Sequence, residues 1–178
     1  MPDAFDILFP DGQDNAPGLP LDIYWNFRSN IADPWPALPA APATPAEQVT
    51  LTGNFAVNGA AYFKTIRIVS ETGMIEHENV AGNDGGQLKS VLKGRIAGEA
   101  DEVEAFIRQV RNSDLVFVVP QINGVTRVMG SKEIPAKARV MNGGSKQVGA
   151  QDGPGYDLEV VVFGLVCPKY TGAVPLSA

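Results

Sequence analysis

The chain has 178 residues, of which 44% are hydrophobic, and its formal net charge is −6. This length and apolar content predict one domain with a substantial core, and they exclude a chain that is disordered or fibrous throughout. Tight and specific binding of DNA or RNA is not expected, because Lys and Arg form no large basic cluster.

The first 46 residues differ from the rest of the chain in charge and in proline content. They hold six Asp and one Arg, a net charge of −5, whereas residues 47–178 hold fourteen acids and thirteen bases, a net charge of −1. Nine of the fourteen prolines also lie there, which favours extended backbone over helix. The chain starts with acids where a secretory signal has bases, and no apolar run is long enough to span a membrane. We therefore expect residues 1–46 to be a Pro-rich acidic arm of a soluble protein that has no membrane partner.

This arm is too apolar for a solvated linker. We expect it to be ordered by lying across its own domain or across a neighbouring subunit, with a small-ligand site at the two tryptophans as a third alternative. The candidate subunit-contact residues in the arm are Trp25, Phe27, Ile31 and Trp35.

The pattern changes to strands after the arm. Residues 49–57 alternate between apolar and polar, Asn58-Gly59 is a turn signal, and residues 62–69 alternate again, which predicts a β-hairpin. A weaker strand over 74–80 and a glycine-rich loop over 82–86 follow. Residues 87–96 predict a strand with one apolar face and one basic face; the apolar face has Leu88, Leu92 and Ile96, and the basic face has Lys89, Lys93 and Arg95.

A short amphipathic helix is predicted over about residues 101–112. Its apolar side chains fall at i, i+3, i+4 and i+7 and form the expected core face: Val103, Phe106, Ile107 and Val110. Asp101 and Glu104 resemble an acidic capping box at its start. Residues 115–119 and 125–129 then predict a second hairpin around a two-residue turn at Asn123-Gly124.

The last third of the chain predicts two more strands and a long loop. Residues 134–141 form a strand with Lys137 and Arg139 on its outer face, and Pro135 places its start at a sheet edge. Residues 142–155 are rich in glycine and predict a long mobile loop, whose subunit-contact candidates are Ser145, Lys146 and Gln147. Residues 156–167 are apolar on both faces from Val160 onward, which predicts a strand covered on both sides.

The sequence therefore predicts a mainly β protein. About eight strands and one flanking helix, without alternating β and α units, favour an antiparallel β-sandwich or barrel. We expect the arm over 1–46, a single domain over 47–172, and a short tail over 173–178.

Residues that could perform chemistry are sparse. His77 is the single histidine, and its neighbours Glu76 and Glu78 point to the opposite face of a strand, so the three side chains cannot share a metal. Cys167 is the single cysteine, in the most apolar strand, where burial disfavours the thiolate. The glycine-rich loops match no phosphate-binding pattern. We therefore assign no catalytic, cofactor-binding or metal-binding residue, and we expect an assembly protein rather than an enzyme.

Several stretches, taken in order, resemble structural proteins of tailed bacteriophages, and in particular tail tube proteins and their relatives in contractile injection machines. The stretches are GLPLDIYWNFRSNIADPWP, VTLTGNFAV, AYFKTIRIV, LKGRIAGEADEVEAFIRQVRN, LVFVVPQINGVTRVMGS, the glycine loop and GYDLEVVVFGLVCPKYTG. The resemblance covers about residues 18–172 and rests on the order of elements.

The resemblance implies a small β-barrel or sandwich flanked by one helix. It also implies a virion protein that forms stacked, hexameric, homo-oligomeric rings around a channel, with other tail or neck proteins as partners and DNA as non-specific passing cargo. Two alternatives stay open. One is a neck, head-completion or tail-terminator protein of the same virion, and the other is a β-sandwich module that binds carbohydrate or another ligand through Trp25 and Trp35. An enzyme with a polar cleft around His77 is the weakest alternative.

Overall fold

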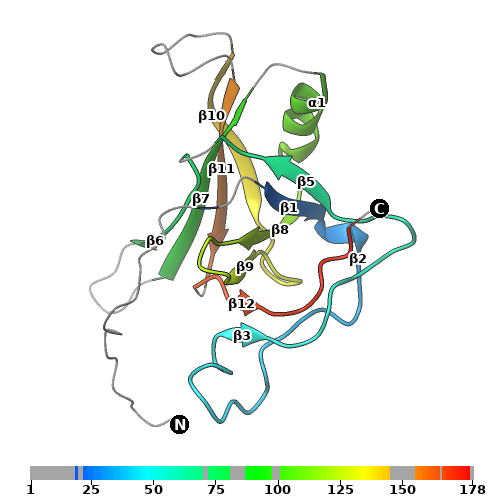
Figure 1. Ribbon diagram of the computed structural model, residues 1–178, viewed down its shortest axis with the longest axis vertical. Helices are drawn as coiled ribbons and strands as arrows, with labels where there is room; N and C mark the ends of the chain where they lie inside the picture. Colours follow the sequence, from blue (N-terminus) through cyan, green and yellow to red (C-terminus); the bar gives the residue numbers. More distant parts are fainter. Residues whose placement is uncertain are drawn as a thin grey trace.

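The computed structural model describes residues 19, 22–69, 72–80, 87–97, 101–144, 155–164 and 166–176. Within these ranges the protein is mainly β, with one α-helix and three sheets, and none of these sheets closes into a barrel (Figure 1). Twelve strands are present in the described part rather than about eight, because several short segments pair over only two residues.

The larger sheet has six strands in the order β3-β12-β9-β8-β1-β5. These are β3 (Thr50–Leu51), β12 (Lys169–Tyr170), β9 (Thr126–Met129), β8 (Leu115–Pro120), β1 (Asp22–Phe27) and β5 (Lys64–Arg67). β1 comes from the predicted arm and pairs with β8 on one side and β5 on the other. The sheet therefore draws on both sides of the predicted boundary at residue 46.

The second sheet has four antiparallel strands in the order β10-β11-β7-β6. They are β10 (Lys137–Gly144), β11 (Gly155–Phe163), β7 (Gln87–Ala97) and β6 (Met74–Val80). A two-stranded ribbon joins β2 (Ile31–Ala32) to β4 (Ala56–Val57), and one turn of 3-10 helix, Arg28–Asn30, connects β1 to β2. The long strands of the second sheet run beside the shorter strands of the first (Figure 1).

Two clusters of apolar side chains hold these layers together. The first lies between the two large sheets and includes Trp25 of β1, Phe117 of β8, Leu92 of β7 and Val160 of β11. The second lies on the other face of the six-stranded sheet, under the loops around residues 31–63 and the C-terminal segment, and includes Phe55. β8 is buried from Leu115 to Val119 because its alternate side chains enter the two clusters.

The helix α1 (Asp101–Val110) confirms the predicted element and its core face. Phe106 and Val110 are buried, and Val103 and Ile107 are partly buried against the first cluster. The helix ends before the predicted residue 112, because Asn112 adopts φ of 63°, which is outside the helical region. Asp101 is already helical, so the residues that would cap the helix lie outside the described ranges.

The hairpin predicted over 49–69 is wrong. β3 pairs with β12, β4 with β2 and β5 with β1, so none of the three pairs with another. The turn at Asn58-Gly59 is real, and Gly59 has φ of 59°, but the strands after it find partners that are far away in sequence.

The second predicted hairpin is confirmed as the pair β8 and β9, but its turn is longer than two residues. Gly124 N donates to Gln121 O at 3.0 Å, and Gln121 N donates to Val125 O at 2.8 Å. Gly124 has φ of 80°, whereas Asn123 is not in the left-handed region. The loop is therefore a three-residue turn with glycine at its last position.

The end of the chain differs from the prediction in three ways. β10 begins at Lys137 rather than at residue 134, and Ile134 is exposed. The predicted loop over 142–155 is shorter than expected, since Gly143 pairs with Tyr156 and Gly144 with Gly155. Ser145, Lys146 and Gln147 lie outside the described residues, and so does the predicted loop over 82–86. β11 ends at Phe163, which is 46% exposed, so the last strand is not covered on both sides along its whole length.

Candidate functional site

One face of the four-stranded sheet carries rows of charged side chains. Direct cross-strand partners lie on the same face of an antiparallel sheet, and the register places Glu78 beside Lys89, Lys93 beside Glu159, and Glu159 beside Arg139. Arg95 and Asp157 are another direct pair of this outer face. The opposite face of the same strands enters the first apolar cluster.

The charges of this outer face are paired across the strands. Lys89 Nζ lies 3.0 Å from Glu78 Oε2, and Arg95 Nη1 lies 2.9 Å from Asp157 Oδ1. Two further pairs are Lys93 with Glu76 at 2.6 Å and Arg139 Nε with Glu159 Oε1 at 3.0 Å. The hydrogen bond from Lys89 lowers the pKa of Glu78, and the hydrogen bond to Glu76 raises the pKa of Lys93.

The basic faces predicted for residues 87–96 and 134–141 are therefore corrected. Lys89, Lys93, Arg95, Lys137 and Arg139 do project from one face, but acids of the neighbouring strands accompany them. Four acids of these strands, Glu76, Glu78, Asp157 and Glu159, stand beside the five bases, and Asp114, just before β8, pairs with Lys137, so the charges balance. Single-strand patterns miss this balance because the acids and bases come from segments far apart in sequence.

The two end strands of this sheet carry charges of opposite sign. β6 contributes Glu76 and Glu78 to the outer face, and β10 contributes Lys137 and Arg139. From one edge to the other, the strands alternate as acidic β6, basic β7, acidic β11 and basic β10. No further strand pairs with the outer side of β6 or of β10 in the described part of the chain.

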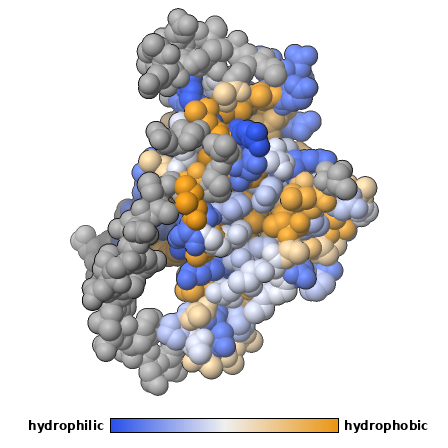
Figure 2. Space-filling view, in the orientation of Figure 1, coloured by the Kyte–Doolittle hydropathy of each residue, from blue (hydrophilic) through white to orange (hydrophobic). Residues whose placement is uncertain are grey.

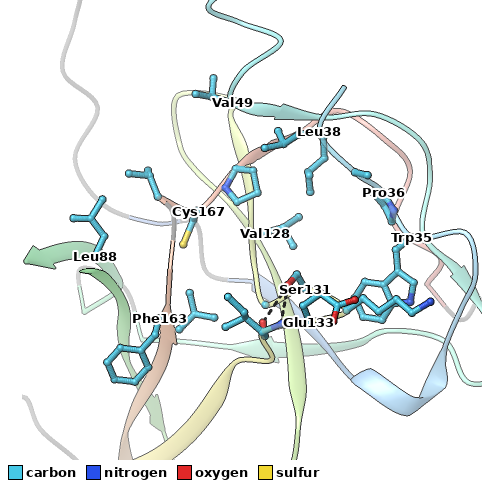
Figure 3. A pocket seen from close by; sticks show the side chains of 18 of the residues that line it. Trp35, Pro36, Leu38, Val49, Leu88, Val128, Ser131, Glu133, Phe163 and Cys167 are labelled. Atoms are coloured by element: carbon cyan, nitrogen blue, oxygen red, sulfur yellow. Dashed lines mark hydrogen bonds between the residues drawn. The ribbon is translucent and has the colours of Figure 1, made fainter. Parts of the chain in front are cut away.

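A second surface feature is an apolar groove. It has a volume of about 640 Å³ and lies where the loops at 35–38 and 131–134 approach the ends of β7 and β11. Trp35 and Phe163 stand on opposite sides of it with Val128 between them, and Cys167 lies on its floor (Figure 3). Its lining includes five exposed large apolar side chains: Leu38, Val49, Ile134, Phe163 and Val166.

Few polar groups reach this groove. Lys132 stands at its rim and pairs with Asp33 at 2.8 Å, which ties the two loops together. Ser131 Oγ accepts a hydrogen bond from Ile134 N at 3.0 Å and so is occupied within its own loop. The lining suits apolar side chains better than it suits a carbohydrate, whose hydroxyl groups need hydrogen-bonding partners. Apolar side chains also form separate patches between hydrophilic areas on the face that Figure 2 displays.

The predicted contact residues of the arm fall into two environments. Trp25 and Ile31 are buried, at 7% and 6% exposure, and Trp25 packs edge-on against Phe106 with ring centres 4.9 Å apart. Trp25 therefore belongs to the core of its own chain and cannot serve as a stacking platform. Phe27 is partly buried against the first cluster, and Trp35 lines the groove. The groove residues outside the arm were missed, because they come from separate segments with no common pattern.

His77, Ser90 and Cys167 form a small polar contact in which the His77 side chain is exposed and the other two side chains are buried. His77 Nδ1 lies 2.8 Å from Ser90 Oγ, and, against the larger opposite effect of burial, Ser90 lowers the pKa of the Cys167 thiol. Desolvation and the nearby Arg127 lower the pKa of His77, and burial raises the pKa of Cys167. Ser90 and Cys167 are each 1% exposed, so this contact presents no accessible nucleophile. No group of three or more metal-ligating side chains gathers among the described residues.

Within the same ranges, no helix has the length and apolar content needed to cross a membrane. Comparison of the chain with protein families, with curated proteins and with solved structures found no match.

Proposed function

We propose that this protein is a structural virion protein, a phage tail tube subunit that assembles into stacked homo-oligomeric rings around a channel for DNA. The observation that carries the proposal is the opposite charge of the two end strands of the four-stranded sheet, Glu76 and Glu78 on β6 against Lys137 and Arg139 on β10. The resemblance of the sequence to tail tube proteins supports the same proposal.

The strand directions make this pairing feasible between copies. Each neighbouring pair in the sheet is antiparallel, so β6 and β10 run in opposite directions. When β10 of one copy lies beside β6 of the next, the contact is again antiparallel and the charged face stays on the same side. The alternation of acidic and basic strands then continues from one copy to the next. A repeated contact between two different surfaces closes into a ring when its rotation allows.

The charged face would then line the channel. With Asp114 counted beside Lys137, five acids accompany the five bases, and the wall has no net charge per subunit. Most of the basic groups are already paired with carboxylates, so few of them are free to hold phosphate, and DNA passing through is bound weakly. In this proposal the four-stranded sheets of neighbouring subunits join edge to edge, so a closed, barrel-like sheet forms only in the assembled ring.

Electron microscopy and light scattering of the purified protein test the proposal. We expect rings or tubes at high protein concentration. Single rings that never stack would favour the neck, head-completion or tail-terminator alternative, whereas a strictly monomeric species would contradict ring assembly altogether.

A charge-exchange experiment tests the contact itself. Variant A carries Glu76→Lys and Glu78→Lys, and variant B carries Lys137→Glu and Arg139→Gln. In variant A alone, bases face bases across the contact. In variant B alone, an acid and a neutral residue on β10 face the acids of β6. We expect each variant alone to lose at least tenfold in rings. In an equal mixture, β10 of variant A can pair with β6 of variant B, and β10 of variant B with β6 of variant A. Opposite charges then meet at both contacts, so we expect rings to form again. Folding is checked by thermal melting of each variant, and a mixture of two folded variants that stays monomeric would rule out this contact.

A further inference from the structure

We propose that the apolar groove receives residues 5–9 of its own chain, Phe5-Asp6-Ile7-Leu8-Phe9. The groove is formed by described residues, but none of them fills it: Val49 is 43% exposed, Ile134 45% and Phe163 46%. A contiguous set of exposed apolar side chains in a concave site normally receives a partner.

Composition singles out this segment among the parts of the chain that the structure does not describe. Four of the five residues 5–9 are large and apolar. Residues 81–86 and 98–100 have no large apolar side chain, residues 145–154 have only Val148, and Leu21 and Leu165 are isolated. Residues 5–9 are therefore the stretch of this chain best suited to an apolar groove.

The spacing of the segment fits a groove with one open side. In an extended backbone, alternate side chains point to opposite sides, so Phe5, Ile7 and Phe9 share one side, and Asp6 and Leu8 lie on the other. Three large apolar groups would then enter the groove while the carboxylate of Asp6 stays in water. This arrangement avoids burying an unpaired charge.

The connection is long enough to reach the groove of the same chain. Leu19 packs beside Ile68, which in turn contacts Gly94 of β7. From Gly94 to Leu88, at the edge of the groove, is six residues along β7, or roughly 20 Å. The nine residues 10–18 span up to about 30 Å when extended. A tether of this length gives an effective concentration of about 1 mM, which favours the segment of the same chain over that of another copy.

The proposal concerns the isolated chain and does not depend on ring formation. It predicts that the groove is covered in the monomer, so a thiol placed there should be protected from labelling. The test replaces Cys167, the single cysteine, by Ser and introduces Val49→Cys as the reporter at the groove. Ile122→Cys, in the turn between β8 and β9 and 52% exposed, is the reporter away from the groove.

Two segment variants are compared on each reporter. The apolar variant carries Phe5→Ser, Ile7→Ser and Phe9→Ser, which remove three large apolar side chains. The acidic variant carries Asp3→Ser, Asp6→Ser and Asp11→Ser, which change the same number of residues but leave the apolar side chains in place. We expect the apolar variant to raise the labelling rate of the residue-49 thiol at least tenfold and the acidic variant to leave it within twofold. Labelling at residue 122 should change with neither variant. Equal rates at residue 49 in all three proteins would overturn the proposal.

Protein concentration and a free peptide provide the second measurement. Protection by a segment of the same chain is independent of protein concentration, whereas protection that grows with concentration would show that another copy supplies it and would overturn the assignment to the same chain. A peptide of residues 3–11 at millimolar concentration should restore protection in the apolar variant, and failure to do so would contradict the fit of segment and groove. The segment and reporter substitutions leave the described core unchanged, and Cys167→Ser, the one change of a buried core residue, is common to every protein compared. Far-UV circular dichroism checks that the fold is kept.

Discussion

At the scale of single residues, the Tyr170 hydroxyl holds two separate stretches of backbone together. It accepts a hydrogen bond from Phe55 N at 3.0 Å and donates one to Ala173 O at 2.7 Å. Tyr170 is 4% exposed, and burial raises the pKa of its hydroxyl. The ring also packs on Phe55 with centres 5.1 Å apart, so one side chain links the second apolar cluster to the C-terminal segment.

We expect Tyr170→Phe to destabilise the fold by about 1–3 kcal/mol, because the buried Phe55 N–H loses its acceptor and finds no water in exchange. Chemical denaturation measures the change. Tyr62→Phe is the matched control, since Tyr62 is 38% exposed and should lose less than about 0.5 kcal/mol. Equal losses in the two variants would contradict the role assigned to Tyr170.

His77 is exposed but has a lowered pKa, so we expect a modest dependence of stability on pH near neutrality. Desolvation and Arg127 lower its pKa in the folded state, so the unfolded chain binds the proton more tightly. The stability contributed by neutral His77 is fully present above its unfolded pKa of about 6.5 and is lost as pH falls toward the folded pKa. We therefore expect the urea concentration at the unfolding midpoint of the wild-type protein to be lower at pH 5.5 than at pH 7.5. In His77→Gln the fall should be smaller, and an identical fall in both proteins would refute the link.

At the scale of elements, the junction between the two sheets depends on close backbone approach. Leu115 N donates to Ala136 O at 3.0 Å and Ala136 N donates to Leu115 O at 2.9 Å, which joins the start of β8 to the residue before β10. Gly130 lies against this pair. A Cβ there would stand 2.7 Å from Leu115 O and 2.9 Å from Ala136 N, which no backbone tolerates without moving.

We expect Gly130→Ala to destabilise the protein by about 3 kcal/mol or more, because the added methyl strains a positive φ and also pushes apart a buried pair of hydrogen bonds. Gly124→Ala separates the two effects. Gly124 also has positive φ, but a Cβ there meets open space, so only the backbone strain of about 1 kcal/mol remains. Thermal melting of both variants checks the difference, and similar melting temperatures would argue against the close approach.

The elements themselves could largely be anticipated from local patterns. The helix and its core face are confirmed, because the period of Val103, Phe106, Ile107 and Val110 is a property of one short segment. β8 and β9 are also confirmed, because a hairpin pairs neighbours in sequence. The prediction of a hairpin over 49–69 was wrong because its strands do not pair with sequence neighbours. The turn forms locally, but the strands on either side of it pair with β1, β2 and β12.

At the scale of the whole molecule, the placement of β1 changes the meaning of the arm. Its apolar side chains suggested contact with the domain or with a neighbour, and both Trp25 and Ile31 are buried within the chain itself. Of the four arm residues proposed for subunit contact, Trp35 is the one that lines an open surface feature, the groove. The proposed contacts between copies therefore rest on the edges of the four-stranded sheet rather than on the tryptophans of the arm.

Local sequence patterns were enough to predict the mainly β character, the single helix, and the alternation of charged and apolar residues along each strand. These follow from repeats of two or about 3.6 residues, which operate within one segment. Only the tertiary structure decided that acids from β6 and β11 accompany the bases of β7 and β10, and that five separate segments enclose one groove. The physical reason is that β-sheets bring distant parts of the chain together through backbone hydrogen bonds that are the same for almost every residue, so local sequence does not name the partner.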